Sequence, residues 1–502
     1  MELSELLVAT GAEQASGGRK KVDVSGVAQD SRKIKKGELF VALPGTQADG
    51  SQFAQEAVAK GAAAVVAEKA MPGLACPVFV VPSAAKALAG IAANFYQRPA
   101  ESLRLLAITG TNGKTTTAYL TESMCAAGGA TTGLLGTIQY RFAGQTSTPT
   151  HTTPDALELH RLFREMVDQG VDTVVMEVSS HALSQERVHG LVFKSAAFTN
   201  LTRDHLDYHK DLEDYFQAKR RLFAERLSPG GVAVVNGDDT YSNRIYTELR
   251  GQKRMAWKFS RRGEGELSAA DVEMTLKGIK ATLKTPAGDI VVKSPLVGAH
   301  NLENILAATG LALAVGLSRR DVQDGVERVA RVPGRMEHVE GGGVVALVDY
   351  AHTDDALRRA LEAARHLAPK GRVLVVFGCG GNRDAGKRPL MGAAAAEGAD
   401  LVVVTSDNPR DEDPDEIIGE ITPGLEKAGM RRMSAGKAKS GEKGYLVDAD
   451  RQKAIGLAVG LAKPGDVVLI AGKGHETYQL IDGEKHPFDD REEAAKALQN
   501  RS

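Results

Sequence analysis

Short apolar runs alternate with helical patterns along most of the chain, and this alternation constrains the fold more than any other feature. The runs Leu103–Thr109, Thr173–Val178 and Val344–Asp349 are largely apolar rather than apolar at every second residue. Strands of that kind are buried on both faces, as in parallel sheets covered by helices. The sequence therefore predicts an α/β fold built on parallel sheets.

The composition excludes several classes of protein. In 502 residues, 63 Lys and Arg stand against 64 Asp and Glu, so no bulk positive charge attracts nucleic acid or an anionic membrane. The cysteines Cys76, Cys125 and Cys379 are far apart and provide neither a disulfide framework nor a CxxC metal site. The chain starts without a signal-peptide pattern, and no apolar stretch approaches the roughly 18 residues of a membrane span. We therefore expect a cytoplasmic protein with no nucleic-acid or membrane partner.

The strongest local signal is a glycine-rich loop between a strand and a helix. After Thr109 the chain reads Gly110-Thr111-Asn112-Gly113-Lys114-Thr115-Thr116. Backbone N–H groups in such a loop, together with the N-terminus of the next helix, bind phosphate oxygens. We expect Lys114 to reach the β- and γ-phosphates of ATP and the Thr115 hydroxyl to ligate Mg²⁺. The GxxxxGK[ST] pattern is incomplete, because Ile108 replaces its first glycine, and an ordinary glycine-rich turn is the alternative.

Two further segments carry candidate metal ligands. Val174–Glu177 is an apolar stretch ending in a carboxylate, the position of the acid on the Mg²⁺ side in P-loop enzymes. Many strands end in an acidic residue, so this signal depends on the loop before it. His205 and His209 are four residues apart and share one face if their segment is helical. A zinc-protease motif requires Glu after the first His, and Leu206 stands there.

The length indicates three domains, at roughly 100–200 residues per domain. We place the boundaries at residues 1–100, 101–335 and 336–502. The central domain is predicted to hold a P-loop-type parallel sheet, the smaller N-terminal domain to be α/β, and the C-terminal domain to be Rossmann-like. The polar, basic stretch over residues 430–444 shows no periodicity and is expected to be a solvated loop.

Several motifs in order along nearly the whole chain resemble those of the Mur ligases. These enzymes attach amino acids to a UDP-N-acetylmuramoyl precursor of peptidoglycan and cleave ATP to ADP and phosphate. The resemblance implies a ligase of cell-wall synthesis, and through it of cell shape and division, with small-molecule substrates and a monomeric state. The motifs are GTNGKTT from Gly110, MEVSSHAL from Met176, FTNLTRDHLDYH from Phe198, QAKRRLF from Gln217, GAHNLENILAA from Gly298 and VDYAHT from Val348.

The resemblance also implies a mechanism. A carboxylate of the UDP-linked dipeptide attacks the γ-phosphate of ATP, and the amine of the incoming amino acid then displaces phosphate from the acyl phosphate. Because the first step gathers several anions, catalysis must consist largely of charge neutralisation and alignment. By similarity the catalytic residues are Lys114, Glu177, His205 and Lys219. Two Mg²⁺ ions are expected on Thr115, Glu177, His205 and Lys219 as a carbamate.

Lys219 resembles the family's lysine that reacts with CO₂ to become N6-carboxylysine. Its own surroundings, Ala218-Lys219-Arg220-Arg221, read instead as a solvated basic helix face. Resemblance assigns further residues to ATP, although Asp354 stands where the family often has proline. These residues are Gly110, Thr111, Asn112, Gly113, Thr116, Asn301, Arg335, Asp349 and His352.

The UDP-linked precursor is expected to bind across the first two domains. The resemblance assigns to it Ser31, Thr46, Gln47, Ala48, Thr152, Thr153, Ser179, Gln185 and Arg187. Read without the family, Asp30-Ser31-Arg32 is equally a turn with a surface ion pair.

Asp407-Asn408-Pro409-Arg410 resembles the motif of family members that add meso-diaminopimelate; members that add lysine lack the arginine. Diaminopimelate differs from lysine by an extra ammonium–carboxylate centre, and a guanidinium binds a carboxylate through two parallel hydrogen bonds. A site built for a carboxylate leaves Arg410 unpaired against lysine, which disfavours lysine. An Asn-Pro turn is the alternative. The amino-acid site is predicted to comprise Arg383, Asp407, Asn408, Pro409, Arg410, Gly472 and Glu476.

Other functions compete with this interpretation. A sibling ligase for lysine and a folylpolyglutamate-type relative are the nearest, and a P-loop switch or motor is the alternative from another class. The segment Phe377–Asn382 has the glycines of a dinucleotide site, but Arg383 occupies the place of the third glycine.

Overall fold

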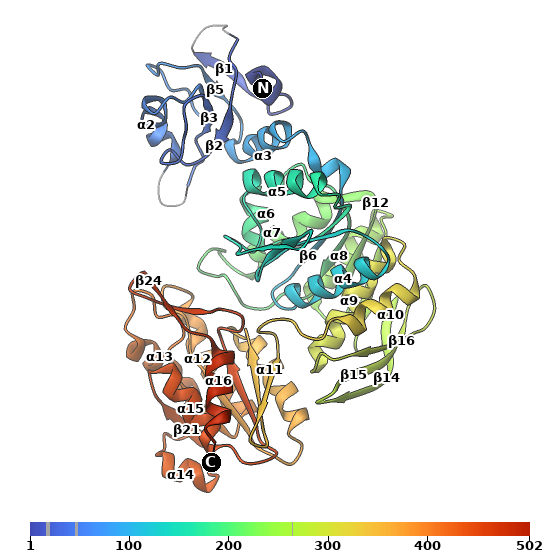
Figure 1. Ribbon diagram of the computed structural model, residues 1–502, viewed down its shortest axis with the longest axis vertical. Helices are drawn as coiled ribbons and strands as arrows, with labels where there is room; N and C mark the ends of the chain where they lie inside the picture. Colours follow the sequence, from blue (N-terminus) through green and yellow to red (C-terminus); the bar gives the residue numbers. More distant parts are fainter. Residues whose placement is uncertain (17–20, 46–48, 264, 502) are drawn as a thin grey trace.

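The computed structural model describes residues 1–16, 21–45, 49–263 and 265–501. Three bodies, each built around a sheet, follow one another along the long axis of the molecule (Figure 1), and the α/β prediction with three domains is confirmed. The N-terminal and C-terminal bodies lie at opposite ends, with the central body between them. No helix of the described residues has both the length and the apolar character to span a membrane.

The N-terminal body contains a small sheet in the order β1-β5-β4-β3-β2, with β2 to β5 parallel and β1 antiparallel. All residues of β4 are buried, as expected for a strand covered on both faces. The strands are β1 Glu13–Ser16, β2 Gly26–Ala28, β3 Glu38–Val41, β4 Ala64–Ala67 and β5 Val78–Val80, and the helices are α1 Leu3–Leu6, α2 Ala54–Ala59 and α3 Ala84–Phe95.

The central sheet runs β16-β15-β14-β13-β12-β11-β6-β10-β7-β8-β9. Its interior from β14 to β7 is parallel, as predicted, whereas the pairs at both edges are antiparallel. The sequence prediction rests on continuous apolar runs, whereas β16 alternates buried and exposed residues, as a strand with one solvated face does. The prediction therefore misses these edges. The strands are β6 Arg104–Thr109, β7 Thr132–Leu135, β8 Tyr140–Phe142, β9 Gln145–Ser147, β10 Thr173–Glu177, β11 Phe193–Phe198, β12 Leu227–Asn236, β13 Ala256–Ser260, β14 Leu267–Thr275, β15 Gly278–Lys284 and β16 Ile290–Ser294.

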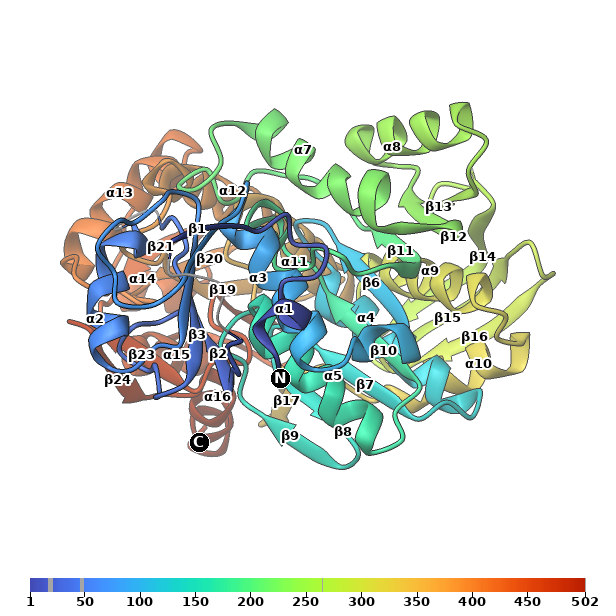
Figure 2. The same ribbon diagram turned by 90° about the horizontal axis from the view of Figure 1, so that it is seen from above.

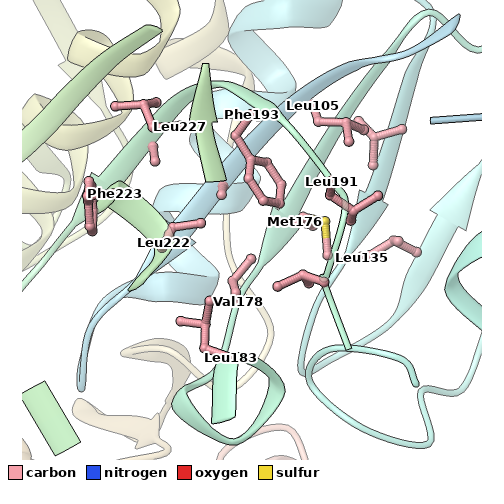
Figure 3. Close-up of a cluster of buried hydrophobic side chains, with 14 of the residues drawn as sticks. Leu105, Leu135, Met176, Val178, Leu183, Leu191, Phe193, Leu222, Phe223 and Leu227 are labelled. Carbon is pink, nitrogen blue, oxygen red and sulfur yellow. The ribbon is translucent and has the colours of Figure 1, made fainter. Parts of the chain in front are cut away.

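Helices cover both faces of this sheet (Figure 2). Successive residues of β6 point to opposite faces, so Leu105 packs into the cluster of Figure 3 with Met176 and Phe193. Leu106 packs on the other face, against α4 and α9. The central helices are α4 Lys114–Ala127, α5 Ala156–Asp168, α6 Ser180–Ser184, α7 Leu212–Arg221, α8 Thr240–Gly251, α9 Ala299–Ala314 and α10 Arg319–Arg328.

The C-terminal sheet runs β17-β18-β22-β19-β20-β21, parallel except for β17 at its edge, and a separate hairpin joins β23 to β24. The strands are β17 Glu337–Gly341, β18 Val344–Asp349, β19 Val373–Phe377, β20 Leu401–Val404, β21 Gly444–Val447, β22 Val467–Ala471, β23 Tyr478–Ile481 and β24 Glu484–Pro487. The helices are α11 Asp354–Leu367, α12 Arg388–Gly398, α13 Pro414–Lys427, α14 Ala435–Ser440, α15 Arg451–Leu461 and α16 Asp490–Gln499.

The expected loop over residues 430–444 is only partly a loop, because α14 lies within it. Ala438 is buried and anchors this short helix to the C-terminal core. Gly441 ends it with a φ of 96°, a left-handed conformation that glycine adopts without strain. The sequence prediction therefore misses a helix of six residues, too short to show a periodic pattern.

Candidate active site

A cleft of about 620 Å³ lies between the central and C-terminal bodies. The adjacent strands β11, β6 and β10 end on one wall, and the loops after β18, β19, β20 and β22 form the other. Ligands of α/β proteins bind at such carboxyl ends. Of the predicted residues, those that line the cleft are Thr111, Asn112, Gly113, Lys114, Thr115, Thr116, Thr152, Glu177, Ser179, Arg187, His205, Lys219, Arg335, Asp349, His352, Arg383, Asp407, Asn408, Arg410, Gly472 and Glu476.

The glycine-rich loop is held closely against the segment that follows β11. Gly110 has a φ of 144°, and a Cβ atom there would lie 1.9 Å from Thr199 Oγ1. Gly113 has a φ of 86°, and its Cβ would lie 2.4 Å from Asn304 Oδ1. Both positions therefore require glycine for backbone conformation and for space.

Two lysines converge on the loop, Lys114 half-buried and Lys219 fully buried. Lys114 Nζ donates to the carbonyls of Gly110 at 3.0 Å and Thr111 at 2.8 Å, and Lys219 Nζ donates to the same Gly110 carbonyl at 2.8 Å. Lys219 is 1% exposed and lies 4.4 Å from the centre of the Tyr215 ring. Burial, helped by the nearby Lys114 charge, lowers the pKa of Lys219 well below its ordinary value.

The interpretation of Lys219 as a solvated basic residue is therefore wrong. Its neighbours Arg220 and Arg221 form the outer face of α7 and pair with Glu248 and Glu186. Lys219 points inward, and this difference depends on the packing of α7 against the loop rather than on local charge.

Glu177 is buried beside the first turn of α4. Its Oε1 accepts from the Thr137 backbone N–H at 2.9 Å, and its Oε2 accepts from the hydroxyls of Thr137 and Thr115 at 3.0 and 3.2 Å. The Arg335 guanidinium, on the segment that links the central and C-terminal bodies, donates to Thr115 Oγ1 at 3.2 Å. Threonine hydroxyl and carboxylate oxygens suit Mg²⁺, so this pair fits the ion that the sequence predicts.

The Asp204 carboxylate lies near both His205 and His352, and His352 belongs to the wall formed by the C-terminal body. His205 Nε2 lies 3.3 Å and His352 Nε2 lies 3.6 Å from Asp204 Oδ2. Burial lowers the pKa of His205 to about 3, which favours the neutral imidazole that a metal requires.

His205 and His209 do not share a helix face, because their segment is not helical. His205 has a φ of 55°, which a helix does not allow, and the described segment 202–209 contains only turns and bends. His209 turns away to Ser180 Oγ at 2.9 Å and Asp214 Oδ2 at 3.2 Å.

Predicted precursor residues lie next to this centre. Thr152 Oγ1 is 3.1 Å from Thr137 Oγ1, which itself donates to Glu177. Arg187 lines the cleft. The buried Thr153 and the exposed Gln185 do not line it, and they accept the Arg187 hydrogen bonds at 2.7–3.0 Å.

The remaining predicted precursor residues belong to the N-terminal body. Ser31 donates to Glu56 at 3.1 Å, and no described residue of that body lines the cleft. Asp30 and Arg32 form the surface ion pair of the alternative interpretation, at 2.9 Å. Thr46, Gln47 and Ala48 lie outside the described residues.

Asn301 lies behind the cleft rather than in it. It donates to Val297 O at 2.8 Å and accepts from Asn304 at 2.9 Å. Its neighbour His300 does line the cleft, and the buried His300 Nδ1 has no hydrogen-bond partner in the described part of the chain. On the opposite wall, Asp349 accepts from the Met336 N–H at 2.8 Å, and burial raises its pKa.

The segment Asp407–Arg410, here called the DNPR loop, and the turn after β22 form one pocket of the cleft. The buried Asp407 Oδ2 lacks a hydrogen-bond partner among the described residues, and a Cβ on Gly472 would lie 2.3 Å from it. Arg410, with a φ of 55°, donates to Gly381 O at 2.8 Å. Arg383 pairs across the cleft with Asp207 at 3.5 Å. Pro409 does not line the cleft.

Several lining residues are absent from the sequence prediction, among them Thr137, His181, Asp204, Tyr350 and Lys387. Asp204 and Tyr350 stand beside predicted residues, so an examination of whole motifs could have found them. Thr137 follows β7 and has no distinctive neighbours in the sequence, and only the fold brings it to Glu177.

The fold and cleft are those expected of a nucleotide-dependent enzyme, because a glycine-rich loop between a parallel strand and a helix faces a pocket lined by Arg410 and Asp407. Family profiles match in three places: "Mur ligase family, catalytic domain" at residues 23–96, "Mur ligase middle domain" at 108–312, and "Mur ligase, glutamate ligase domain" at 334–474. The chain belongs to the Mur ligase family.

Individual relatives extend over the full chain. The UDP-N-acetylmuramoyl-L-alanyl-D-glutamate–2,6-diaminopimelate ligase of Geobacter metallireducens is 45% identical, over 97% of this chain and 96% of its own. The enzyme with the same name from Gloeobacter violaceus is 45% identical over 100% and 99%. A solved structure with that name is 35% identical, with a TM-score of 0.66 over 95% of both chains.

Proposed function

We propose that this protein is an ATP-dependent amide-bond ligase that adds meso-diaminopimelate to UDP-N-acetylmuramoyl-L-alanyl-D-glutamate through an acyl-phosphate intermediate. The observation that carries the proposal is one cleft lined by both the phosphate loop and a pocket with Arg410 and an unpartnered Asp407 carboxylate. The relatives named above support the choice of substrates. The protein is proposed to act in the cytoplasm as a monomer, with domains at residues 1–100, 101–335 and 336–502.

The phosphate loop and its lysines serve the first half of the reaction. Lys114 exchanges its bonds to the loop carbonyls for the phosphate oxygens of ATP, and Arg335 approaches the same phosphates from the segment between the bodies. These cations offset the charge that accumulates when the precursor carboxylate attacks the γ-phosphate. Asp349, His352 and Asn301 complete the proposed ATP site. Asn301 does not line the cleft, and its proposed role is to accept a hydrogen bond from Asn304, which does.

Two Mg²⁺ ions are proposed near Thr115, Glu177, His205 and Lys219, where they would neutralise the phosphate oxygens of ATP. Lys219 is proposed to react with CO₂ there, with its nitrogen forming a bond to carbon and losing a proton. The resulting carbamate N–H can still donate to Gly110 O, while its carboxylate extends toward the metal side. The full burial of Lys219 and its contact with the loop support this modification.

The amino-acid pocket serves the second half of the reaction, in which the amine displaces phosphate. Arg410 and Arg383 are proposed to bind the far carboxylate of diaminopimelate, and Asp407 and Glu476 to accept its far ammonium group. Arg383 already pairs with a carboxylate, that of Asp207, which the substrate would replace. The amine at the other end then attacks the acyl phosphate, and phosphate leaves.

Precursor binding is proposed to involve Ser31, Thr46, Gln47, Ala48, Thr152, Thr153, Ser179, Gln185 and Arg187. Thr152, Ser179 and Arg187 supply the part of this site that lines the cleft. Thr153 and Gln185 act by holding Arg187.

Phosphate release by the purified protein tests this function. With ATP, Mg²⁺ and the UDP-linked dipeptide, release is expected only when diaminopimelate is also present, and lysine should substitute poorly. Release without an amino acid would favour the P-loop switch or motor instead. Equal turnover with lysine would contradict the proposed specificity for diaminopimelate but would still support ligase activity.

A further inference from the structure

Beneath the DNPR loop lies a lysine that the proposed mechanism does not use. Lys473 stands between two glycines in the turn that follows the central strand β22, and its side chain is 0% exposed. Gly474 has a φ of 53°, and a Cβ there would lie 2.7 Å from Gly334 O. The turn is therefore held tightly, and Lys473 has little freedom to point elsewhere.

The Lys473 ammonium group contacts two polar residues of the amino-acid pocket, Asn408 and Glu476. Its Nζ donates to Asn408 Oδ1 at 3.0 Å and to Glu476 Oε2 at 3.1 Å. Asn408 Nδ2 donates to the same Glu476 Oε2 at 2.8 Å. A buried ammonium requires such partners, because an unpaired charge inside a protein is very costly.

These contacts determine which atoms face the cleft. Asn408 Oδ1 also accepts from the Leu480 N–H at 2.9 Å, so the Asn408 amide has only one favourable orientation. Glu476 Oε2 is occupied by two donors, whereas Glu476 Oε1 makes no hydrogen bond to the described residues. Since Glu476 lines the cleft, Oε1 is the oxygen available to a ligand.

We propose that Lys473 is a positioning residue that holds Glu476 so that Oε1 meets the far ammonium group of the amino-acid substrate. The inference rests on the proposed function and adds to it the residue that orients the ammonium acceptor. Lys473 also lies 5.7 Å from the ring centre of Tyr478 in β23, so it joins the DNPR loop to the hairpin behind it. Lys473 itself does not touch the substrate.

The Lys473→Met substitution tests this role, because methionine is of similar length but carries no charge or donor. We expect the KM for diaminopimelate to rise at least tenfold, with the KM values for ATP and the UDP-linked dipeptide changed less than twofold. Lys473→Gln, which keeps one donor, should give an intermediate KM. The matched control is Lys485→Met, since Lys485 is exposed and lies 4.3 Å from the Tyr478 ring centre without touching Glu476.

A double-mutant cycle with Glu476→Gln separates positioning from general structural damage. If Lys473 acts through Glu476, then Lys473→Met should raise the KM for diaminopimelate less than twofold further in the Glu476→Gln background. This background also removes the half-buried carboxylate that Lys473→Met would leave without its ammonium partner, so the double variant remains testable if Lys473→Met alone does not fold. Full additivity of the two changes, or an equal loss for all three substrates, would overturn the proposal.

An experiment can contradict the proposed function and the positioning role of Lys473 independently of each other. If wild-type protein shows no release of phosphate that depends on diaminopimelate, the function is wrong before any Lys473 variant is compared. If wild-type protein is active and the Lys473 variants match it, only the positioning role is wrong.

Discussion

At the scale of single residues, the side chains of Lys114 and Lys219 both donate to the carbonyl of Gly110, and only Lys114 is proposed to bind phosphate. Lys219 is the fully buried one of the two, and its proposed conversion to a carbamate places a negative charge on the side of the site where Mg²⁺ is proposed to bind. In a Lys219→Ala variant, a small carboxylate from solution can replace the carbamate only if it fits the cavity that the shortened side chain leaves.

Lys219→Ala should therefore lower turnover at least a hundredfold, and formate or acetate should restore part of it. Lys210→Ala is the control, because Lys210 is exposed and lies just before α7. Steady-state phosphate release with and without the added acid measures both effects. Unchanged turnover in Lys219→Ala would contradict the carbamate proposal.

The specificity of the amino-acid pocket also belongs to this scale. Arg410→Ala removes the guanidinium that is proposed to pair with the far carboxylate, and a hydrogen bond to a charged group contributes about 1.5–3 kcal/mol. We expect kcat/KM for diaminopimelate to fall roughly tenfold to a hundredfold, while the weak use of lysine rises, because no guanidinium is then left unpaired against it. Arg432→Ala, at an exposed arginine of the same domain, is the control. An equal loss with both amino acids would argue against carboxylate recognition.

At the scale of elements, the turn between β6 and α4 depends on glycine for two separable reasons. Gly113 and Gly129 have nearly the same φ, 86° and 88°, but only at Gly113 would a Cβ meet another atom. Their comparison isolates the close approach to Asn304 from the strain of a left-handed backbone.

Gly113→Ala and Gly129→Ala should both lose stability, by about 1–3 kcal/mol from backbone strain. Gly113→Ala should lose more and should also raise the KM for ATP, because the loop must move away from Asn304. Thermal unfolding and ATP-dependent kinetics measure the two effects. Identical behaviour of the two variants would show that contact with Asn304 does not shape the loop.

At the scale of the whole molecule, an ion pair and a hydrogen bond cross the cleft between the central and C-terminal bodies. Arg203 donates to both carboxylate oxygens of Asp384 at 3.1 and 3.2 Å, and Asn112 donates to Asp355 at 3.2 Å. Since the proposed mechanism uses groups from both walls, these contacts favour the arrangement in which the walls face each other.

Exchanging the Arg203–Asp384 charges tests this coupling. Arg203→Asp and Asp384→Arg should each raise the KM for diaminopimelate about threefold, consistent with about 0.2–1 kcal/mol for a partly exposed pair. The double exchange should restore much of the affinity, and high salt should reduce the differences. If the double variant is worse than either single one, the pair does not hold the two walls together.

The sequence by itself determined the alternation of buried strands with helices, the glycine-rich loop and the DNPR motif, because these depend on residues close together in the chain. Gly110 and Lys114 show this, since strand, glycine turn and helix N-terminus form one local unit. Only the tertiary structure decided that Lys219 is buried, that His209 turns away from His205, and that Asn301 lies behind the cleft. Burial depends on packing between segments distant in sequence, as where α7 brings Lys219 against a loop 109 residues earlier. No local pattern encodes that distance.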